Sequence, residues 1–321
     1  MAFLSCIIIA RNQLYTIVNC IESVFISLEA SSINNYEIIY IDSSSTDNTI
    51  TVLKERFDHT ISVYQISGAM NAPIARNTGA SLSKGDTLLF IDGDMVVNKN
   101  FIKEVYSNSD GLKYDAVSGK LSEQFYDSHW NKCSYSKDRY NVKSSIQSSD
   151  LGGIFFIKKE IFKELNGFKS YLLENEDMDF VFRLRKNRYN FYRIPLQIAT
   201  HHTVNYDSFS RIFTRFLKGN HLYDGVLYRE NLTNYYCIKT IVKHQRFLAI
   251  LLISIAASFT FSGWFIFLYP FFIILKYLIN RKVSLLETFI ATFLRDISGI
   301  TGFFFFFPDK KLSEKTIYVK I

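Results

Sequence analysis

The first 105 residues alternate strand-like runs with helix-like patterns, and this alternation constrains the fold more than any other feature. Four apolar runs have the length and composition of β-strands: residues 3–10, 36–42, 61–66 and 86–92. Three intervening segments place apolar side chains at helical spacing: residues 14–28, 45–57 and 72–85. Such alternation predicts an α/β fold, with a mostly parallel sheet flanked by helices.

Two of the predicted strands end in an aspartate, Asp42 and Asp92. Because parallel sheets bind ligands beyond the carboxyl ends of their strands, both side chains are expected to face one crevice. The triplet Asp92-Gly93-Asp94 adds a second carboxylate, and its glycine allows the backbone to approach a ligand closely. Magnesium and manganese prefer carboxylate oxygens and share the phosphates of nucleotides. The triplet therefore predicts a divalent-cation site that binds a nucleotide.

Five segments occur in a characteristic order between residues 3 and 205: "IIIARNQ", "YIDSSSTDNT", "APIARNTGASLSKGDTLLFIDGDM", "GGIFFIKKEIFKELNGF" and "ENEDMDFVFRLRKN". Together they resemble the family 2 glycosyltransferases of the GT-A fold, of the bacterial polysaccharide type. Such enzymes move a sugar from a nucleotide-diphospho-sugar to an acceptor hydroxyl, usually with inversion of the anomeric centre. The resemblance implies a sugar donor, UDP-linked in our interpretation, and a Mg²⁺ or Mn²⁺ cofactor.

The resemblance also assigns donor-binding roles. The turn at Ala10 and Arg11 would hold the nucleoside together with Asp42, which would meet the base. Arg76, in "ARNTG", would lie near the nucleotide, and Asp92 would approach the ribose or the metal. The implied donor-binding residues are Ala10, Arg11, Asp42, Arg76 and Asp92.

The metal and the base are assigned in the same way. Asp94 would ligate the metal under the diphosphate, with Asp92 as a further candidate ligand. A histidine after the next strand often completes such a site; His201 is our choice, and His202 is the alternative. Asp177 would be the general base, because a sugar hydroxyl is a poor nucleophile until a carboxylate takes its proton.

Simpler interpretations exist for several of these residues. Asp42 could cap the following helix, and Asp94 could be a turn residue. The acidic residues at 174–179 could be a helix start favoured by the helix dipole. Arg183 and Arg185 are expected on a solvated helix face.

Other functional classes fit the sequence less well. A sugar-phosphate nucleotidyltransferase would carry a glycine-rich basic loop after its first strand, and "IIIARNQ" has none. A non-catalytic scaffold would not need Asp92, Asp94 and Asp177 together. The net charge of +7 is not gathered into a dense basic run, so no nucleic-acid partner is expected. The segment "RIFTRF" stands where processive synthases carry Gln-x-x-Arg-Trp, which favours addition of one sugar at a time.

Regular patterns are sparser after residue 105. Between residues 106 and 200 we expect helices only near 158–165 and 175–189, and we expect an amphipathic helix over residues 208–231. Residues 247–275 then carry no charged side chain. About 20 apolar residues span a bilayer, so this run could be one tilted helix or a hairpin broken near Ser262-Gly263 and Pro270. A buried cluster of helices in a soluble protein is the alternative.

Basic residues flank the uncharged run on both sides: Lys239, Lys243, Arg246, Lys276, Arg281 and Lys282. Positive flanks are typical of cytoplasmic segments, which favours a hairpin over a single crossing. We therefore expect a catalytic domain over residues 1–235 and membrane-associated helices over residues 236–321. The protein would lie at the cell membrane with its catalytic domain on the cytoplasmic face. Its partners would be membrane lipid and a polyprenyl-diphosphate-linked glycan acceptor.

Overall fold

The computed structural model describes residues 2–204, 208–244, 246–279 and 284–321. The chain forms two compact units: Met1–Asn205 with Asp309–Ile321, and Tyr206–Pro308. The expected boundary between residues 235 and 236 thus lies inside the second unit. The division differs because the helices before residue 235 pack on a later helix, and because the last residues return to the first sheet.

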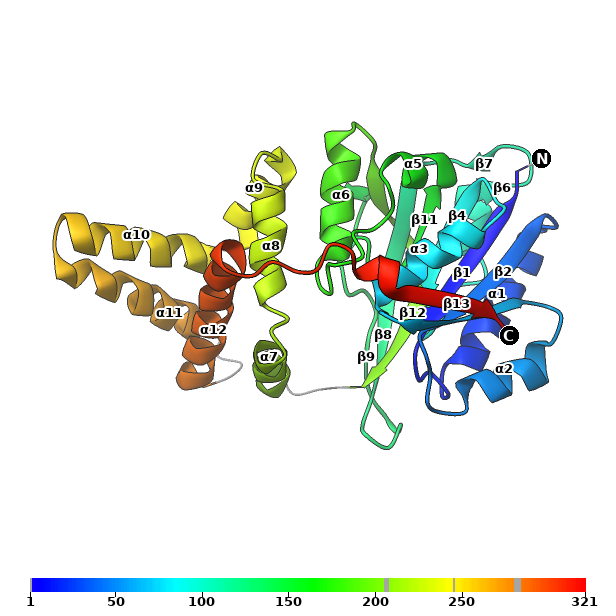
Figure 1. Ribbon diagram of the computed structural model, residues 1–321, viewed down its shortest axis with the longest axis horizontal. Coiled ribbons are helices and arrows are strands. Elements are labelled where there is room, and N and C mark those ends of the chain that lie inside the picture. Colours follow the sequence, from blue (N-terminus) through cyan, green and yellow to red (C-terminus); the bar gives the residue numbers. More distant parts are fainter. Residues whose placement is uncertain (1, 205–207, 245, 280–283) are drawn as a thin grey trace. The chain divides into compact units, whose positions relative to one another are not determined.

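Four parallel strands form the centre of the first unit, and they match the predicted runs: β1 (Leu4–Ala10), β2 (Tyr36–Asp42), β3 (Ser62–Gly68) and β4 (Thr87–Asp92). Their order is β4-β1-β2-β3, and each neighbouring pair is parallel. Three helices connect them: α1 (Ile17–Ala30), α2 (Thr49–Phe57) and α3 (Ala72–Leu82) (Figure 1). The predicted α/β sheet is confirmed.

Helices cover both faces of this sheet. Cys6 and Ile8 of β1 pack in a buried cluster with residues of α1 and α2. Ile7 and Ile9 face the opposite way and pack with residues of α3. Because successive strand residues point to opposite faces, a strand that is apolar throughout requires a helical layer on each side.

Helix α3 approaches the sheet closely at Gly79. A Cβ at this position would overlap Ile7 and would lie 3.4 Å from Cγ1 of Ile41. Only glycine allows this approach, and it fixes α3, which carries Arg76, against the strands.

Further strands extend the sheet beyond β4, in a region where little regular structure was expected. Strand β11 (Ile154–Lys158) lies antiparallel to β4 and to β8 (Ala116–Tyr126), and β12 (Phe191–Val204) lies parallel to β8. Three short strands join this half: β5 (Met95–Val97), β9 (Lys132–Ser136) and β10 (Ile146–Gln147). Helices α5 (Lys159–Glu164) and α6 (Glu176–Lys186) occur where they were predicted. The remaining elements are α4 (Phe101–Val105), β6 (Tyr106–Ser107) and β7 (Gly111–Leu112).

The C-terminal segment returns to the first unit. After the short 3₁₀ helix η2 (Leu312–Lys315), strand β13 (Thr316–Lys320) pairs antiparallel with β3. The sheet order is therefore β10-β12-β8-β11-β4-β1-β2-β3-β13. Pairing with β13 covers the edge that β3 would otherwise expose.

The second unit is helical: α7 (Ser208–Leu217), α8 (Leu222–Glu230), α9 (Tyr235–His244), α10 (Arg246–Thr260), η1 (Gly263–Phe267), α11 (Leu268–Ile279) and α12 (Leu285–Phe304). Glycines allow α8 and α12 to pack closely, since a Cβ on Gly225 would lie 2.6 Å from the carbonyl carbon of Gly302. Helices α10 and α11 pack on each other with the expected break at Ser262-Gly263. The amphipathic segment at 208–231 is two helices rather than one, because the chain turns at Gly219, where φ is +71°.

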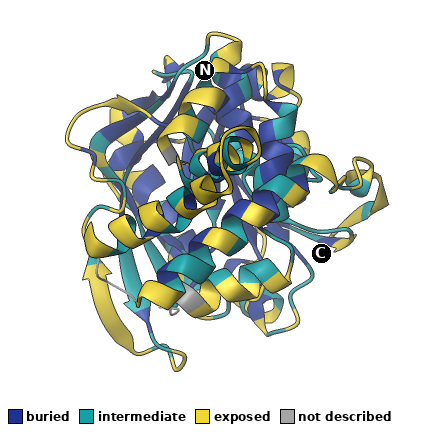
Figure 2. Ribbon diagram, turned by 90° about the vertical axis from the view of Figure 1, so that its left-hand side faces the viewer, coloured by how far each residue is buried: buried dark blue, intermediate teal, exposed yellow. Residues whose placement is uncertain are grey.

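No single described helix combines the length and the apolar character needed to cross a membrane. One pair, Tyr235–Lys243 with Arg246–Thr260, meets the criterion only when its two helices are taken together, and they are bent by 83°. Many large apolar residues of the second unit are nevertheless exposed. Figure 2 colours the exposed residues of the chain yellow.

Candidate active site

A cavity of about 300 Å³ lies at the carboxyl ends of β1 and β4. The strand register places Ile9 beside Asp92, so the ends of these strands open into the same space. Residues that line it include Ala10, Arg11, Ser43, Asn71, Asp92 and Asp94. Four of the predicted site residues (Ala10, Arg11, Asp92 and Asp94) therefore share one cavity.

Asp42 ends the neighbouring strand, but its side chain does not line this cavity. The residue is fully buried, and its carboxylate accepts hydrogen bonds from the backbone and the hydroxyl of Ser45, at 2.8 and 2.6 Å. Gln65 and the Tyr40 hydroxyl donate to it as well. The expectation that this carboxylate faces the crevice was wrong, because donors within its own turn and on β3 turn it inward. Ser43 lines the cavity in its place.

Arg76 lies at the centre of a buried ion-pair network. Only 4% of the residue is exposed. Its guanidinium donates to Oδ1 of Asp92 at 2.8 Å and to Oε1 of Glu176 at 3.0 Å. Burial lowers the pKa of Arg76, but the charges of Asp92 and Glu176 outweigh this and raise it. Arg76 therefore remains a cation and connects the end of β4 with the start of α6.

Glu176 carries an altered acidity of its own. Burial and the neighbouring charge of Asp177 raise its pKa to about 7, against the opposing effect of Arg76. Burial also raises the pKa of Asp92, although Arg76 lowers it. The acidic pair Glu176-Asp177 could be recognised in the sequence. The contact between Glu176 and Arg76 joins residues 100 positions apart, so no local pattern indicates it.

Asp177 lies in the first turn of α6, beside the loop of residues 150–153. Its carboxylate accepts a hydrogen bond from the amide of Met178 at 2.7 Å and a long one from Gly152 at 3.5 Å. Burial and the charge of Asp150 raise its pKa, which makes its carboxylate a stronger proton acceptor. The next residue of the loop, Gly153, accepts a hydrogen bond from the amide of Asp92 at 2.8 Å. One loop thus contacts the carboxylate of Asp177 and the backbone of Asp92.

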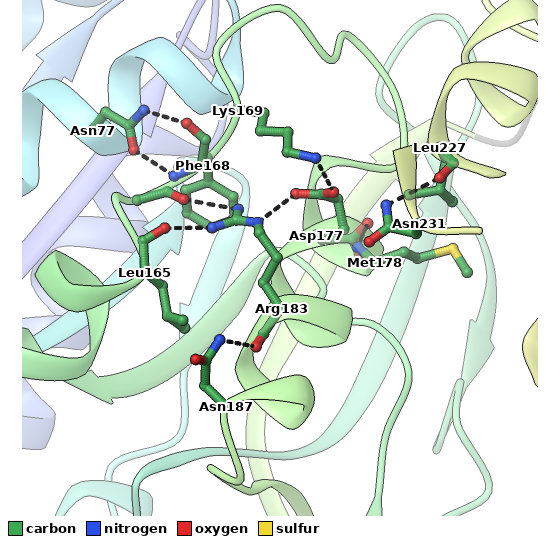
Figure 3. Close-up of polar contacts among 12 residues, drawn as sticks. Asn77, Leu165, Phe168, Lys169, Asp177, Met178, Arg183, Asn187, Leu227 and Asn231 are labelled. Carbon is green, nitrogen blue, oxygen red and sulfur yellow. Dashed lines mark hydrogen bonds and ion pairs between the residues drawn. The ribbon is translucent and has the colours of Figure 1, made fainter. Parts of the chain in front are cut away.

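Further contacts anchor helix α6 near its C-terminal end. Arg183 donates to the carbonyls of Leu165 and Gly167, and Asn187 donates to the carbonyl of Arg183 (Figure 3). Arg183 also pairs with the fully buried Asp179 at 2.7 Å. The expectation of a solvated Arg183 was wrong, because the loop before α6 supplies carbonyl acceptors to it. The bonds from Arg183 attach α6, the helix that carries Asp177, to the loop that precedes it.

Asp94 and His201 are the pair best placed to hold a metal. Pairing of β5 with β12 brings Nε2 of His201 to 3.2 Å from Oδ2 of Asp94. Oδ1 of Asp94 is buried without a hydrogen-bond partner among the described residues, and such an orphaned carboxylate oxygen fits a cation. His202 instead contacts the hydroxyl of Tyr126 through Nδ1 at 2.7 Å. The geometry therefore favours His201 over His202.

The described residues do not form a complete cage of protein ligands. Within the described ranges, no three His, Cys, Asp or Glu side chains gather to hold an ion. Asp92 does not join Asp94 because Arg76 holds its carboxylate. Glu123, which the sequence did not single out, lies 3.6 Å from Nδ1 of His201. Burial lowers the pKa of His201, but its bond to Asp94 and the charges of Asp94, Asp92 and Glu123 outweigh this and raise it.

Comparisons with known proteins agree with this geometry. The model of glycosyl transferase family 2 matches residues 5–165, half of the chain. An uncharacterized glycosyltransferase of Haemophilus influenzae is 26% identical over 188 residues, which cover 55% of this chain and 62% of that protein. The poly(ribitol-phosphate) beta-N-acetylglucosaminyltransferase TarP of Staphylococcus aureus is 26% identical over 164 residues, which cover 49% of this chain and 50% of that protein.

The chain thus matches only part of each of these relatives. A solved structure of S. aureus TarS, residues 1–349, aligns with a TM-score of 0.51 at 13% identity, and the alignment covers 97% of this chain and 90% of that one. At this identity the likeness concerns the fold alone. The family match, the parallel sheet and the acidic cavity at its strand ends together identify the chain as a member of glycosyl transferase family 2.

Proposed function

We propose that this protein transfers a sugar from a UDP-linked donor to a hydroxyl of a glycan acceptor, with inversion and one sugar at a time. The observation that carries the proposal is the cavity at the strand ends, which Asp92 and Asp94 line. Arg76 and the loop at 150–153 connect Asp92 with the start of α6, where Asp177 lies. A donor site and a candidate base are thereby parts of one continuous network.

The chemistry follows from the residues. Asp94 and His201 would hold Mg²⁺ or Mn²⁺, which when bound offsets the charge that develops on the departing diphosphate. The acceptor oxygen forms a bond to the anomeric carbon while the bond from that carbon to the phosphate oxygen breaks. Asp177 accepts the proton of the acceptor hydroxyl, and the nucleoside diphosphate leaves. Arg76 keeps Asp92 in place during this step.

The acceptor is proposed from the second unit. Phe261 and Trp264, at the turn between α10 and α11, are 81% and 78% exposed. Aromatic side chains exposed beside an uncharged run suit a lipid surface, so we propose that this turn binds the cytoplasmic face of the cell membrane. A polyprenyl-diphosphate-linked glycan in the same bilayer would then meet the enzyme at high effective concentration. TarP, by its name, acts on poly(ribitol-phosphate).

Turnover of nucleotide-sugars tests the activity. A panel of labelled nucleotide-sugars is incubated with the protein and Mn²⁺, with and without chelator, and the released nucleotide is identified. A glycosyltransferase releases a nucleoside diphosphate, including by slow hydrolysis without acceptor. Release of pyrophosphate from sugar phosphate and nucleoside triphosphate would instead indicate a nucleotidyltransferase. Binding without any turnover, even with membrane extract as acceptor source, would indicate a scaffold.

Vesicle flotation tests the membrane proposal. The variant Phe261→Ser/Trp264→Ser removes two exposed aromatic side chains, each worth about 1.5–3 kcal/mol when buried, so binding to lipid vesicles should fall by about 100-fold or more. The control is Tyr135→Ser, which removes an aromatic side chain of the first unit that is 55% exposed. Equal flotation of the two variants would contradict the proposal.

A further inference from the structure

A buried arginine, Arg193, contacts the loop of residues 150–153, which in turn contacts Asp177 and Asp92. Only 2% of the Arg193 side chain is exposed. Its guanidinium carbon lies 3.4 Å from the centroid of the Tyr140 ring, close enough for a cation–π interaction. Its Nη2 donates to the carbonyl and to Oδ1 of Asp150, both at 3.0 Å, and to the carbonyl of Leu151 at 3.4 Å. The cation is thus directed at the backbone of the loop.

Burial of the Arg193 charge costs free energy, so a contribution to stability alone does not explain it. The Asp150 side chain is 35% exposed, whereas Arg193 is almost fully buried, and its Nε has no hydrogen-bond partner among the described residues. Desolvation of such a charge offsets much of what the pair contributes to stability. The buried cation is better explained by the loop backbone that it holds in place.

The loop of residues 150–153 needs contacts with its neighbours to hold its shape. Gly152 has a left-handed backbone with φ of +74°, and a Cβ there would lie 2.6 Å from the hydroxyl of Tyr140. A glycine pair also costs the most conformational entropy to order. Tyr140 contacts Arg193 on one side and crowds Gly152 on the other, so the arginine, the ring and the glycine form one packed set.

We propose that Arg193 is a positioning residue for the base: it fixes residues 150–153, and through the amide of Gly152 it fixes the carboxylate of Asp177. The inference rests on the proposed function, in which Asp177 takes the acceptor proton. Asp92 is less dependent on the loop, because Arg76 holds it separately. Loss of Arg193 should therefore impair the chemical step more than donor binding.

Hydrogen exchange measures the positioning without any assay of activity. In Arg193→Met, amides of residues 148–156 should exchange about fivefold faster or more, because the loop opens locally. Amides of β1 and β2 should be unchanged. The matched control is Arg56→Met, which removes an exposed arginine paired only with Glu22 among the described ion pairs. Unchanged exchange at 148–156 in a folded Arg193→Met protein would overturn the proposal.

Kinetics separate positioning from general damage. In Arg193→Met, kcat should fall by about 50-fold or more while the donor KM changes by less than about threefold. Arg193→Lys keeps a donor for the Asp150 carbonyl and should recover about tenfold of the loss. Equal losses in both variants, together with faster exchange throughout the sheet, would assign Arg193 a structural role and overturn the proposal.

If Arg193→Met fails to fold, a third variant tests whether Arg193 positions the loop. Asp150→Ala removes one acceptor of Arg193 from a partly exposed position and leaves no buried cavity. It should speed exchange at 148–156 and lower kcat, and parental values for both would overturn the proposal. If the parental protein turns over no nucleotide-sugar, the proposed function fails, whereas the exchange result still decides whether Arg193 holds the loop.

Discussion

Gly153 packs against the carboxylate of Asp92, and Gly153→Ala is expected to displace that carboxylate while leaving the fold intact. A Cβ at residue 153 would overlap Oδ2 of Asp92 and would lie 3.0 Å from its Cγ and 2.7 Å from Cε of Met95. Carbon atoms in contact prefer a separation of about 3.5–4.0 Å, so the carboxylate must move by roughly 1 Å. The backbone at Gly153 does not have the positive φ that only glycine favours, so alanine adds no backbone strain there.

The displacement falls on a side chain that cannot move freely. Oδ1 of Asp92 is held by Arg76 at 2.8 Å, and Arg76 is held in turn by Glu176 at 3.0 Å. Moving Asp92 therefore weakens the bridge to α6. A misplacement of about 1 Å in a reacting site can cost about 10²-fold in rate, which corresponds to about 2.7 kcal/mol of transition-state stabilisation.

The assay is turnover of the donor identified in the nucleotide-sugar panel, measured with the thermal unfolding of each variant. Gly153→Ala should turn over about 100-fold more slowly, and a cooperative melting transition should show that the variant remains folded. The control is Gly263→Ala in the second unit, where a Cβ would meet nothing within 4 Å. A folded Gly153→Ala protein with parental turnover would refute the placement of Asp92 in the reacting site.

Three further predictions follow from the same contacts. Asp177→Asn should retain donor binding and lose at least about 10²-fold of transfer, as measured by single-turnover kinetics; parental transfer would remove Asp177 as the base. Asp150→Asn should move the acidic limb of the pH–rate profile to lower pH, because the charge of Asp150 raises the pKa of Asp177 while Arg76 and the amide of Gly152 lower it. A base acts above its own pKa, so an unmoved or raised limb would contradict this. Gly79→Ala should lower the free energy of unfolding by about 1–3 kcal/mol, because its Cβ would overlap Ile7; an unchanged denaturation midpoint would contradict it.

Local patterns in the sequence were sufficient to predict the parallel half of the sheet. The predicted run at 36–42 coincides with β2, and the helix expected at 72–85 ends only three residues early, at Leu82. Side chains on both faces of β1 and β4 are buried, so each of these two strands is a nearly continuous apolar run. Short apolar runs of this kind, separated by helical patterns, can be recognised in the sequence as buried strands.

The second half of the sheet depends on pairing between distant segments. Strand β8 lies beside β12, and β13 pairs with β3 across almost the whole chain. The residue pattern of a β-strand indicates which of its faces is buried, but it does not indicate which strand is its neighbour. For this reason the return of the last residues to the first unit, and the unit boundary that results, could not be predicted.

The same distinction applies to the site. Asp92, Asp94 and Asp177 stand in motifs and could be selected from the sequence. Glu123 and Arg193 could not, because their roles arise from contacts to His201 and to the loop at 150–153 that only the folded chain creates. The inward turn of Asp42 likewise depends on Gln65, a donor supplied by the neighbouring strand.

Metal-dependent donor binding tests the central claim most directly. Melting temperatures are compared with and without a UDP-sugar, in Mn²⁺ and in chelator, for the parental protein, Asp94→Ala and the exposed control Asp58→Ala. At 100 times Kd the donor stabilises the parental protein by about 2.7 kcal/mol. The parental protein and the control should show this shift only with Mn²⁺, and Asp94→Ala should show none. An equal Mn²⁺-dependent shift in Asp94→Ala would contradict the assignment of the cation and the donor diphosphate to this cavity.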